Sequence, residues 1–497
     1  MKPARITREF EGADLGDPRR NRRLVRVAER LAAAPERSLS GASGGWDESM
    51  AAYRLLAAPQ VTPEKILAPH RRALLERAAS ESALVVIQDT TELDFTRMKH
   101  MEGNGPLNEE KRRGLLLHSL YVVSEEGLPL GVWEADFMAR SDEDFRGAAS
   151  RKHLPMEQKE SHRWVEGYRR TQALAQELPH CEVFSLSDRE GDIYEVFAAW
   201  AEAAAAGGPC AQWIIRANQD RALDDTGGRV PDKPADDKPA DKRSADKLAP
   251  EKLFAALEGA PLLGEMSFEM PAKTWLKKVR GNRVQTSRSA RTVRQEVRAM
   301  AVRPRPPYRK GKQLPPLTIW AVLAQEVDPP EGEEPVCWIL LTSCEVTTFE
   351  AAKRIIALYL RRWDIEVFHR TLKTGCRVEQ LQIKGSQAVR NALAIYIITA
   401  WRILYLTHLA RVRPELPCST VFAAEEWQAA CAVARPGRPA PRDPPTLGEF
   451  IGIVARLGGH LGRRSDGAPG AQAIWQGLVR VRDFACAWRA MNNRQAE

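Results

Sequence analysis

The alternation of apolar and polar residues changes along the chain, and each change predicts a different kind of element. The first 75 or so residues read as helices, with Asp17 as an N-cap and Pro18 at the first helical position. From about residue 80 short β-rich runs predict strands instead, at 83–87, 115–123, 128–137, 182–186 and 212–216. Helices are expected at 156–177 and 193–205. Strands in antiparallel order, followed by strands that alternate with helices, predict an α/β domain with a mixed sheet.

A stretch of different composition interrupts this domain. Residues 220–250 contain an Asp-Lys-Pro-Ala repeat, a charged low-complexity tract that we expect to be unstructured. Residues 273–312 carry fourteen Lys and Arg and one acid, Glu296, interleaved with Val and Thr, which favours a basic, strand-rich insertion. A strand at 336–341 and one long helix from about 348 to 378 follow. The remainder reads as helical, with a Pro-rich linker at 435–446 and an amphipathic pair at 447–461 and 472–491.

Composition and charge narrow the class of protein. A hydrophobic fraction of 43% and a charged fraction of 28% are typical of a folded globular chain, and 497 residues predict two to four domains. The net charge of +9 is mild and favours a polyanionic partner. The N-terminus lacks a signal peptide and no run of about 18 apolar residues is evident, so we expect a cytoplasmic protein without membrane contact. The eight cysteines form no CxxC pair, which favours reduced thiols over zinc or disulfides.

Basic residues gather at the start of the first predicted helix. Five arginines and no acid lie between residues 19 and 28. A solvated charged helix and a phosphate-binding helix both fit this pattern. We take Arg19, Arg20 and Arg23 as candidate DNA contacts.

Two aspartates stand directly after predicted strands, Asp89 after 83–87 and Asp188 after 182–186. Carboxylates at strand ends can converge at one edge of a sheet. There they can hold Mg²⁺, which prefers a few carboxylate oxygens. Taken singly, an aspartate at such a place is more often a turn or cap residue, and Asp188 could cap the helix after it.

The predicted helix at 348–378 carries a polar face. At about 100° per residue, four residues fall within a stripe about 60° wide, and Arg370 lies at its edge. The four are Tyr359, Arg362, Glu366 and Lys373. One acid among a phenol and cations favours a metal-binding carboxylate on a phosphate-binding surface. A solvent-exposed face of ion pairs is the alternative.

These motifs together resemble the insertion-sequence-four family of transposases. The pattern Tyr-x-x-Arg-x-x-x-Glu-x-x-x-x-x-x-Lys is typical of that family. Other matching segments occur in the same order: LGDPRR, AAYRLL, IQDTT, SDREGD, CWILLTS, RRWDIEVFHRTLKTG and IVARLGG. The resemblance implies an α/β fold with a ribonuclease-H-like mixed sheet flanked by helices, a β-rich insertion, and helical N- and C-terminal domains. The implied domains are 1–75 for DNA-end binding, 76–219 with 336–380 for catalysis, 220–335 as the insertion, and 381–497 for dimerisation.

The resemblance also implies a role for each candidate residue. Asp89, Asp188 and Glu366 would be the catalytic, metal-binding triad, holding two Mg²⁺ ions for which Mn²⁺ can substitute. Trp338 would stack a base flipped out of the duplex. The implied DNA contacts are Tyr359, Arg362, Arg370, Lys373 and Arg216. The partners would be double-stranded DNA, as transposon ends and target, and a second copy of the chain.

The implied activity is cut-and-paste DNA transposition through a hairpin intermediate, in the cytoplasm at the nucleoid. Two alternatives remain open from the sequence. One is a catalytically silent DNA-end-binding repressor derived from a transposase, although all three acids are intact. The other is a metal-dependent nuclease that cuts but never joins. The basic insertion and the helical C-terminal part exceed what a simple nuclease needs.

Overall fold

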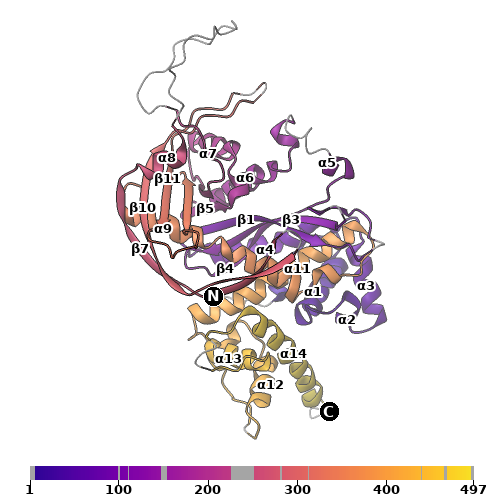
Figure 1. Ribbon diagram of the computed structural model, residues 1–497. Coiled ribbons are helices and arrows are strands. Elements are labelled where there is room, and N and C mark those ends of the chain that lie inside the picture. The colour runs from indigo at the N-terminus through magenta and orange to yellow at the C-terminus, as the bar shows by residue number, and fades with distance from the viewer. Residues whose placement is uncertain are drawn as a thin grey trace, which may run out of the picture. The chain divides into compact units, whose positions relative to one another are not determined.

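The computed structural model forms two compact units (Figure 1). Unit 1 comprises Met1–Arg163, Ala173–Val183 and Arg361–Glu497; unit 2 comprises Trp164–Gln172 and Phe184–Leu360. The structure describes residues 6–98, 101–109, 111–146, 154–224, 251–279, 282–309, 311, 313–437, 439–463 and 467–493. The tract at 220–250, expected to be unstructured, lies outside the described residues from 225 onward.

Unit 1 begins with helices, as the sequence predicts. The Asp17 side chain caps α1 by accepting a hydrogen bond from the Arg19 backbone N at 2.7 Å, and Pro18 is the first helical residue. Leu24, Val27, Ala28 and Leu31 form the buried face of α1. The N-terminal elements are η1 (Ile6–Glu9), α1 (Pro18–Ala33), α2 (Leu39–Ala42), α3 (Trp46–Leu56) and α4 (Pro63–Ala78).

The strands of unit 1 pair in antiparallel order. They are β1 (Ala83–Asp94), β2 (Gly105–Pro106), β3 (Arg113–Ser124) and β4 (Pro129–Met138). β3 pairs with β1, β2 and β4, and the β3–β4 hairpin confirms the two strands predicted at 115–123 and 128–137. The position predicted for Asp89 is wrong, because β1 does not end at Ile87. Its pairing with β3 continues to Asp94, so Asp89 lies inside the strand, opposite Ser119.

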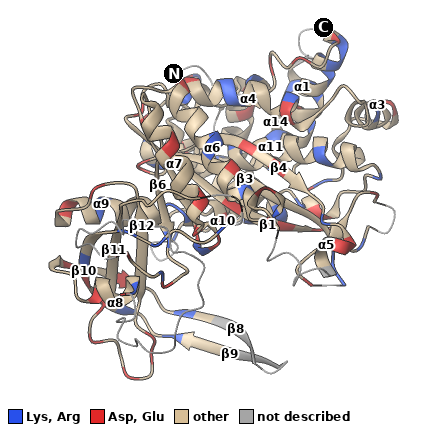
Figure 2. Cartoon of the chain, turned by 90° about the horizontal axis from the view of Figure 1, so that it is seen from above, with Lys and Arg blue, Asp and Glu red and all other residues tan. Residues whose placement is uncertain are grey.

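Unit 2 contains a mixed sheet with the strand order β5-β6-β12-β11-β10-β7. β5 and β6 are parallel and the other neighbours are antiparallel, which confirms the predicted mixed sheet. The strands are β5 (Glu182–Ser187, its first two residues in unit 1), β6 (Gln212–Arg216), β7 (Leu262–Met270), β10 (Arg291–Val302), β11 (Ile319–Glu326) and β12 (Cys337–Thr342). The basic stretch forms strands as predicted, including a separate ribbon of β8 (Lys273–Val279) and β9 (Asn282–Arg288) (Figure 2).

Short helices accompany these strands. The Phe197 ring stacks on Trp213 of β6 with centroids 4.5 Å apart, so α7 packs on the sheet of unit 2. The helices are η4 (Arg189–Gly191), α7 (Tyr194–Ala206), α8 (Leu253–Glu258) and α9 (Phe349–Leu360). Before them come α5 (Asp142–Arg146), η3 (Met156–Gln158) and α6 (His162–Glu177).

The single helix predicted at 348–378 is wrong. The structure has α9, then α10 (Trp363–Arg370), then a five-residue π-helix, η5 (Thr371–Gly375). Arg361, between α9 and α10, is held by a hydrogen bond from its Nε to the Glu125 carbonyl at 3.1 Å. Because the segment is broken and ends in a wider π turn, the spacing of about 100° per residue used for one straight helix does not apply along its whole length. Tyr359 belongs to unit 2, whereas Arg362, Glu366 and Lys373 belong to unit 1.

The C-terminal part of unit 1 is helical. It contains η6 (Val378–Gln380), α11 (Ser386–Val412), η7 (Cys418–Thr420), α12 (Ala424–Ala434), α13 (Leu447–Leu457) and α14 (Ala471–Asn493). The last two confirm the predicted amphipathic pair, and α14 packs on α12 and α13 (Figure 1). By length and composition α11 could cross a membrane, contrary to the sequence reading, but 89% of its apolar window is buried inside the protein. It is the core helix of unit 1.

Candidate active site

Two of the three predicted acids approach one guanidinium group in unit 1. Arg362 donates a hydrogen bond from Nη2 to Oε1 of Glu366, and its Nη1 lies 3.9 Å from Oδ2 of Asp89. The side chains of Asp89 and Arg362 are 19% and 17% exposed, and that of Glu366 is 36% exposed. Strand β1 and helix α10 therefore bring their carboxylates to a common, half-buried position.

Contacts behind Glu366 fix α10 against the strands. Oγ of Ser119, opposite Asp89 on β3, lies 2.9 Å from Nε2 of the buried His369. The Phe368 ring stacks on Tyr121 of the same strand with centroids 4.7 Å apart. Burial lowers the pKa of His369 to about 3, so its ring is neutral. These contacts hold α10 against β3, and so they fix where Glu366 lies relative to Asp89 on the neighbouring strand β1.

Lys373 lies on the π-helix, within electrostatic range of Asp89. Burial lowers the pKa of its ammonium group, and the negative charges of Glu379, Glu92 and Asp89 oppose that shift. Arg370, in the last turn of α10, is exposed. The segment after Glu366 thus places one partly buried and one exposed cation on the unit that holds Asp89.

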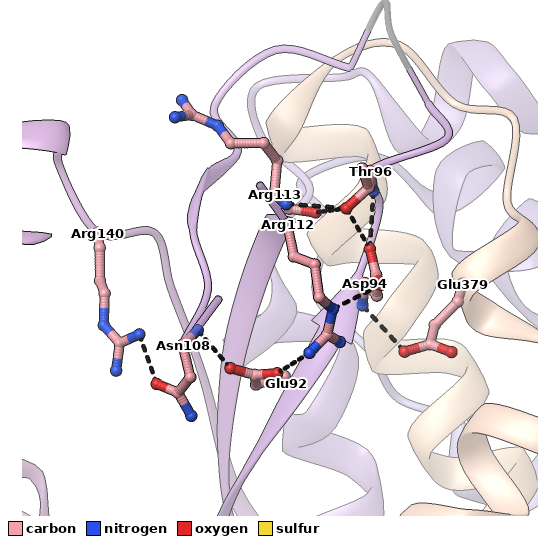
Figure 3. Close-up of polar contacts among 8 residues, drawn as sticks. All are labelled: Glu92, Asp94, Thr96, Asn108, Arg112, Arg113, Arg140 and Glu379. Carbon is pink, nitrogen blue, oxygen red and sulfur yellow. Dashed lines mark hydrogen bonds and ion pairs between the residues drawn. The ribbon is translucent and has the colours of Figure 1, made fainter. Parts of the chain in front are cut away.

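A polar network ties the far end of β1 to the chain beyond the π-helix (Figure 3). The backbone N of Asp94 donates to Oε1 of Glu379 at 2.9 Å. Arg112 donates to Asp94 at 2.9 Å and to Glu92 at 2.7 Å. Thr96, Asn108, Arg113 and Arg140 extend the network. Glu379 is not among the residues predicted from the sequence, because its partner lies 285 residues away in the chain.

Asp188 belongs to unit 2, where it directly follows β5 as predicted. Its Oδ1 accepts a hydrogen bond from the Glu190 backbone N at 2.8 Å and caps η4. Asp188 is therefore a cap residue, but of this short turn, because the N-cap of the predicted helix, α7, is Ile193. A cap uses one carboxylate oxygen, which is compatible with a further role for the other.

The other predicted contacts in unit 2 occupy different environments. Trp338 on β12 is partly exposed, and its ring stacks on Phe268 with centroids 6.0 Å apart at 9°. Nη2 of Arg216 donates to the Cys337 carbonyl at 3.4 Å, so Arg216 lies beside the strand position next to Trp338. Tyr359 on α9 is only 6% exposed.

Most arginines of α1 are exposed at the surface. Arg19 and Arg23 are exposed. Arg20 is half-buried, and its Nη1 donates to the Leu15 carbonyl at 3.2 Å. This helix therefore presents cations on the side opposite its buried face.

The carboxylate pair suits a hard divalent cation. Carboxylate oxygens such as those of Asp89 and Glu366 are the ligands that Mg²⁺ prefers. Among the described residues, no three His, Cys, Asp or Glu side chains are grouped so that they could hold a metal ion. Asp89 and Glu366 meet within unit 1, whereas Asp188 is described in the other unit.

Three protein families match segments of the chain in order. Residues 4–61 match "Transposase DNA-binding", 209–402 match "Transposase DDE domain", and 398–494 match "Transposase Tn5 dimerisation domain". With the mixed α/β sheet, these matches define a DDE transposase with a ribonuclease-H-like fold. The three matches, in this order, are consistent with a Tn5-like transposase of the insertion-sequence-four family, in agreement with the resemblance seen in the sequence. The DDE match includes Glu366 and excludes Asp89 and Asp188.

Proposed function

We propose that this transposase is an active cut-and-paste enzyme that cleaves transposon ends and joins them to target DNA. The observation that carries the proposal is the Arg362 guanidinium between Asp89 and Glu366. It brings two acids and a phosphate-binding cation to one place, as phosphoryl transfer requires. Asp188 completes the proposed triad from the end of β5.

We infer that Asp89, Asp188 and Glu366 hold two Mg²⁺ ions, for which Mn²⁺ can substitute. DDE transposases generally use divalent metals, and when bound such a pair activates the attacking oxygen and stabilises the leaving one. Arg362 and Lys373 then bind phosphate oxygens of the transposon end, with Arg370 and Tyr359 as further contacts. Once DNA is present, its phosphate replaces the carboxylates as the acceptor for the Arg362 guanidinium.

The proposed reaction has four steps. Water frees a 3′-hydroxyl at the transposon end, and that hydroxyl attacks the opposite strand to form a hairpin. A second water opens the hairpin, and the 3′-hydroxyl then joins target DNA. Trp338 would stack a flipped base in the hairpin step, as its parallel stack on Phe268 supports, with Arg216 holding the adjacent backbone.

The rest of the chain supplies DNA-end binding and assembly. Residues 4–61 match a family of transposase DNA-binding domains, and residues 398–494 match a family of transposase dimerisation domains. We propose that Arg19, Arg20 and Arg23 bind end DNA and that residues 381–497 dimerise the chain on it. The catalytic domain would comprise 76–219 and 336–380, with 220–335 as an insertion. The protein would act in the cytoplasm at the nucleoid.

The test is incubation of the full chain with a duplex of the flanking insertion-element end, a target plasmid and Mg²⁺. We expect excised, blunt transposon ends and strand-transfer products. Cutting without joining would identify a nuclease, and binding without cutting would identify a silent repressor. Asp188→Ala should abolish cutting and leave end binding nearly intact, whereas unchanged Mg²⁺-dependent cutting would overturn the site assignment.

A further inference from the structure

A second cationic site lies in unit 1, apart from the acids. A cavity of about 710 Å³ is lined by residues of α1, α11, α12 and α14. Its lining includes five arginines: Arg26, Arg30, Arg402, Arg482 and Arg489. The first two belong to the segment matched as DNA-binding, and the other three to the segment matched as the dimerisation domain. The cavity is therefore shared by two segments with separate roles.

Four acids line the same cavity, and two of them already accept hydrogen bonds. Glu48 accepts hydrogen bonds from Arg30 at 3.3 Å and from the Gly44 backbone N at 2.8 Å. Glu426 accepts one from the Ala423 backbone N at 2.8 Å, as part of the N-terminal cap of α12. Glu29 and Glu425 complete the acidic lining, and Glu29 is exposed. Arg30 thus has a carboxylate partner, and the five arginines outnumber the four acids of the lining by one.

Burial disfavours the charged form of two of these arginines, Arg402 and Arg482. Burial lowers the pKa of both guanidinium groups. At Arg402 the negative charges of Glu426 and Glu9 oppose this shift only in part. Nε of Arg402 is inaccessible to solvent and has no hydrogen-bond acceptor in the part of the chain that the structure describes. A buried polar group without a partner is costly, and a buried charge more so. Such a group points to a ligand that supplies the acceptor.

We propose that this cavity binds a phosphate-bearing ligand. Guanidinium groups pair with phosphate oxygens through two parallel hydrogen bonds, and several of them around one space give a polyphosphate-sized site. The volume is within the range of small-molecule sites, about 300–1,000 Å³. The phosphate can come from a free polyphosphate or nucleotide, or from the backbone of bound DNA. The site is independent of Asp89, Asp188 and Glu366, so it goes beyond the proposed reaction.

The test is titration of the full chain with inorganic pyrophosphate by calorimetry. Wild type should bind saturably, and Arg482→Gln and Arg402→Gln should each weaken the dissociation constant about tenfold or more. Arg456→Gln, which removes an exposed arginine of α13 outside the cavity, is the matched control and should bind as wild type does. Absence of saturable binding, or equal affinity in all four proteins, would overturn the proposal.

Thermal unfolding separates a ligand site from a structural ion pair. Because Arg402 and Arg482 are poorly compensated, each glutamine variant should unfold at or above the wild-type temperature without ligand, and should lose the pyrophosphate-induced increase. If Arg402→Gln fails to fold, Arg402 is needed for stability and is not an uncompensated charge. Pyrophosphate binding by Arg482→Gln then still tests whether the cavity is a ligand site.

Competition identifies the source of the phosphate. If duplex DNA displaces pyrophosphate from wild type, the site takes a DNA phosphate. If both bind at once, it takes a free polyphosphate. The Asp188→Ala protein should bind pyrophosphate normally, so failure of the proposed reaction and failure of this site are distinguishable.

Discussion

Arg362 donates a hydrogen bond to Glu366, one helical turn further along α10, while its other terminal nitrogen lies 3.9 Å from Asp89. One guanidinium therefore links the acid of a strand to the acid of a helix, 277 residues later in the chain (366 − 89). Two carboxylates approach each other at low cost only with a cation between them. The same position suits a divalent metal once DNA phosphate engages the arginine.

Replacing Arg362 should affect both partners. Arg362→Gln removes the phosphate contact and leaves the two carboxylates unneutralised, so we expect single-turnover cleavage of end DNA to fall by about 10²-fold or more. Arg362→Lys should restore part of the rate because it keeps the charge but not the fork of donors. Arg370→Gln, an exposed neighbour, is the control and should lose less. Equal losses for Arg362→Gln and Arg370→Gln would contradict the special position of Arg362.

Trp338 should matter at one step more than at the others. Trp338→Ala removes the ring that stacks on Phe268, and we expect hairpin formation to slow more than the first nick. Trp338→Phe should retain a larger share of the hairpin rate. Quantifying nicked and hairpin products on denaturing gels checks this. Equal loss at both steps would argue for a purely structural role.

Asp364 should destabilise the protein at neutral pH. Burial raises the pKa of its carboxyl from 3.8 to about 6, against the opposing charge of Arg361. Because the folded-state pKa is raised, the contribution of Asp364 to stability is unaffected below pH 3.8, becomes destabilising as the pH rises from 3.8 to 6, and stays so above that pH. Asp364→Asn should therefore stabilise the protein by about 2 kcal/mol at pH 7 and leave it unchanged at pH 3.5. Urea unfolding at both pH values measures the difference, and a loss of stability at pH 7 would refute it.

A buried network in unit 1 should have the opposite dependence on pH. Burial favours the neutral form of Glu9, but Arg77 and His70 outweigh it and lower its pKa from 4.5 to about 2. Arg77 donates to Glu9 at 2.7 Å and lies over the Trp401 ring at 4.3 Å. The stabilisation is complete above pH 4.5 and is lost as the pH falls toward 2.

Glu9→Gln should cost about 3 kcal/mol at pH 7, because Arg77 would remain buried without its carboxylate. Urea unfolding of this variant and of Glu11→Gln, an exposed acid two residues away, gives the comparison. A small, equal effect of both substitutions would show that the network contributes little.

Local signals predicted much of the fold. The Asp17-Pro18 helix start, the β3–β4 hairpin and the strand at 212–216 depend on residues close in sequence, and all three are confirmed. The extension of β1 to Asp94 depends on pairing with β3, so the polar residues after Ile87 gave no sign of it. The break before α10 contains no Gly or Pro. It depends on contacts such as that of Arg361 with Glu125, 236 residues away.

The candidate site also has a part that the sequence predicted and a part that it did not. The acids and the phosphate-binding cations followed from the family pattern around Glu366. The helix projection that grouped them was wrong, because α10 and the π-helix replace one continuous helix. The link from Asp94 to Glu379 and the arginine-lined cavity both join segments hundreds of residues apart, which no spacing rule reaches.

The most direct test of the central claim is the number of metal ions bound by the three acids. Electron paramagnetic resonance can count Mn²⁺ bound to the full chain in complex with a cleaved-end duplex. We predict two bound ions per wild-type chain and fewer in Asp89→Asn, Asp188→Asn and Glu366→Gln, with DNA binding retained. Two ions bound by Asp188→Asn as tightly as by wild type would contradict a shared site.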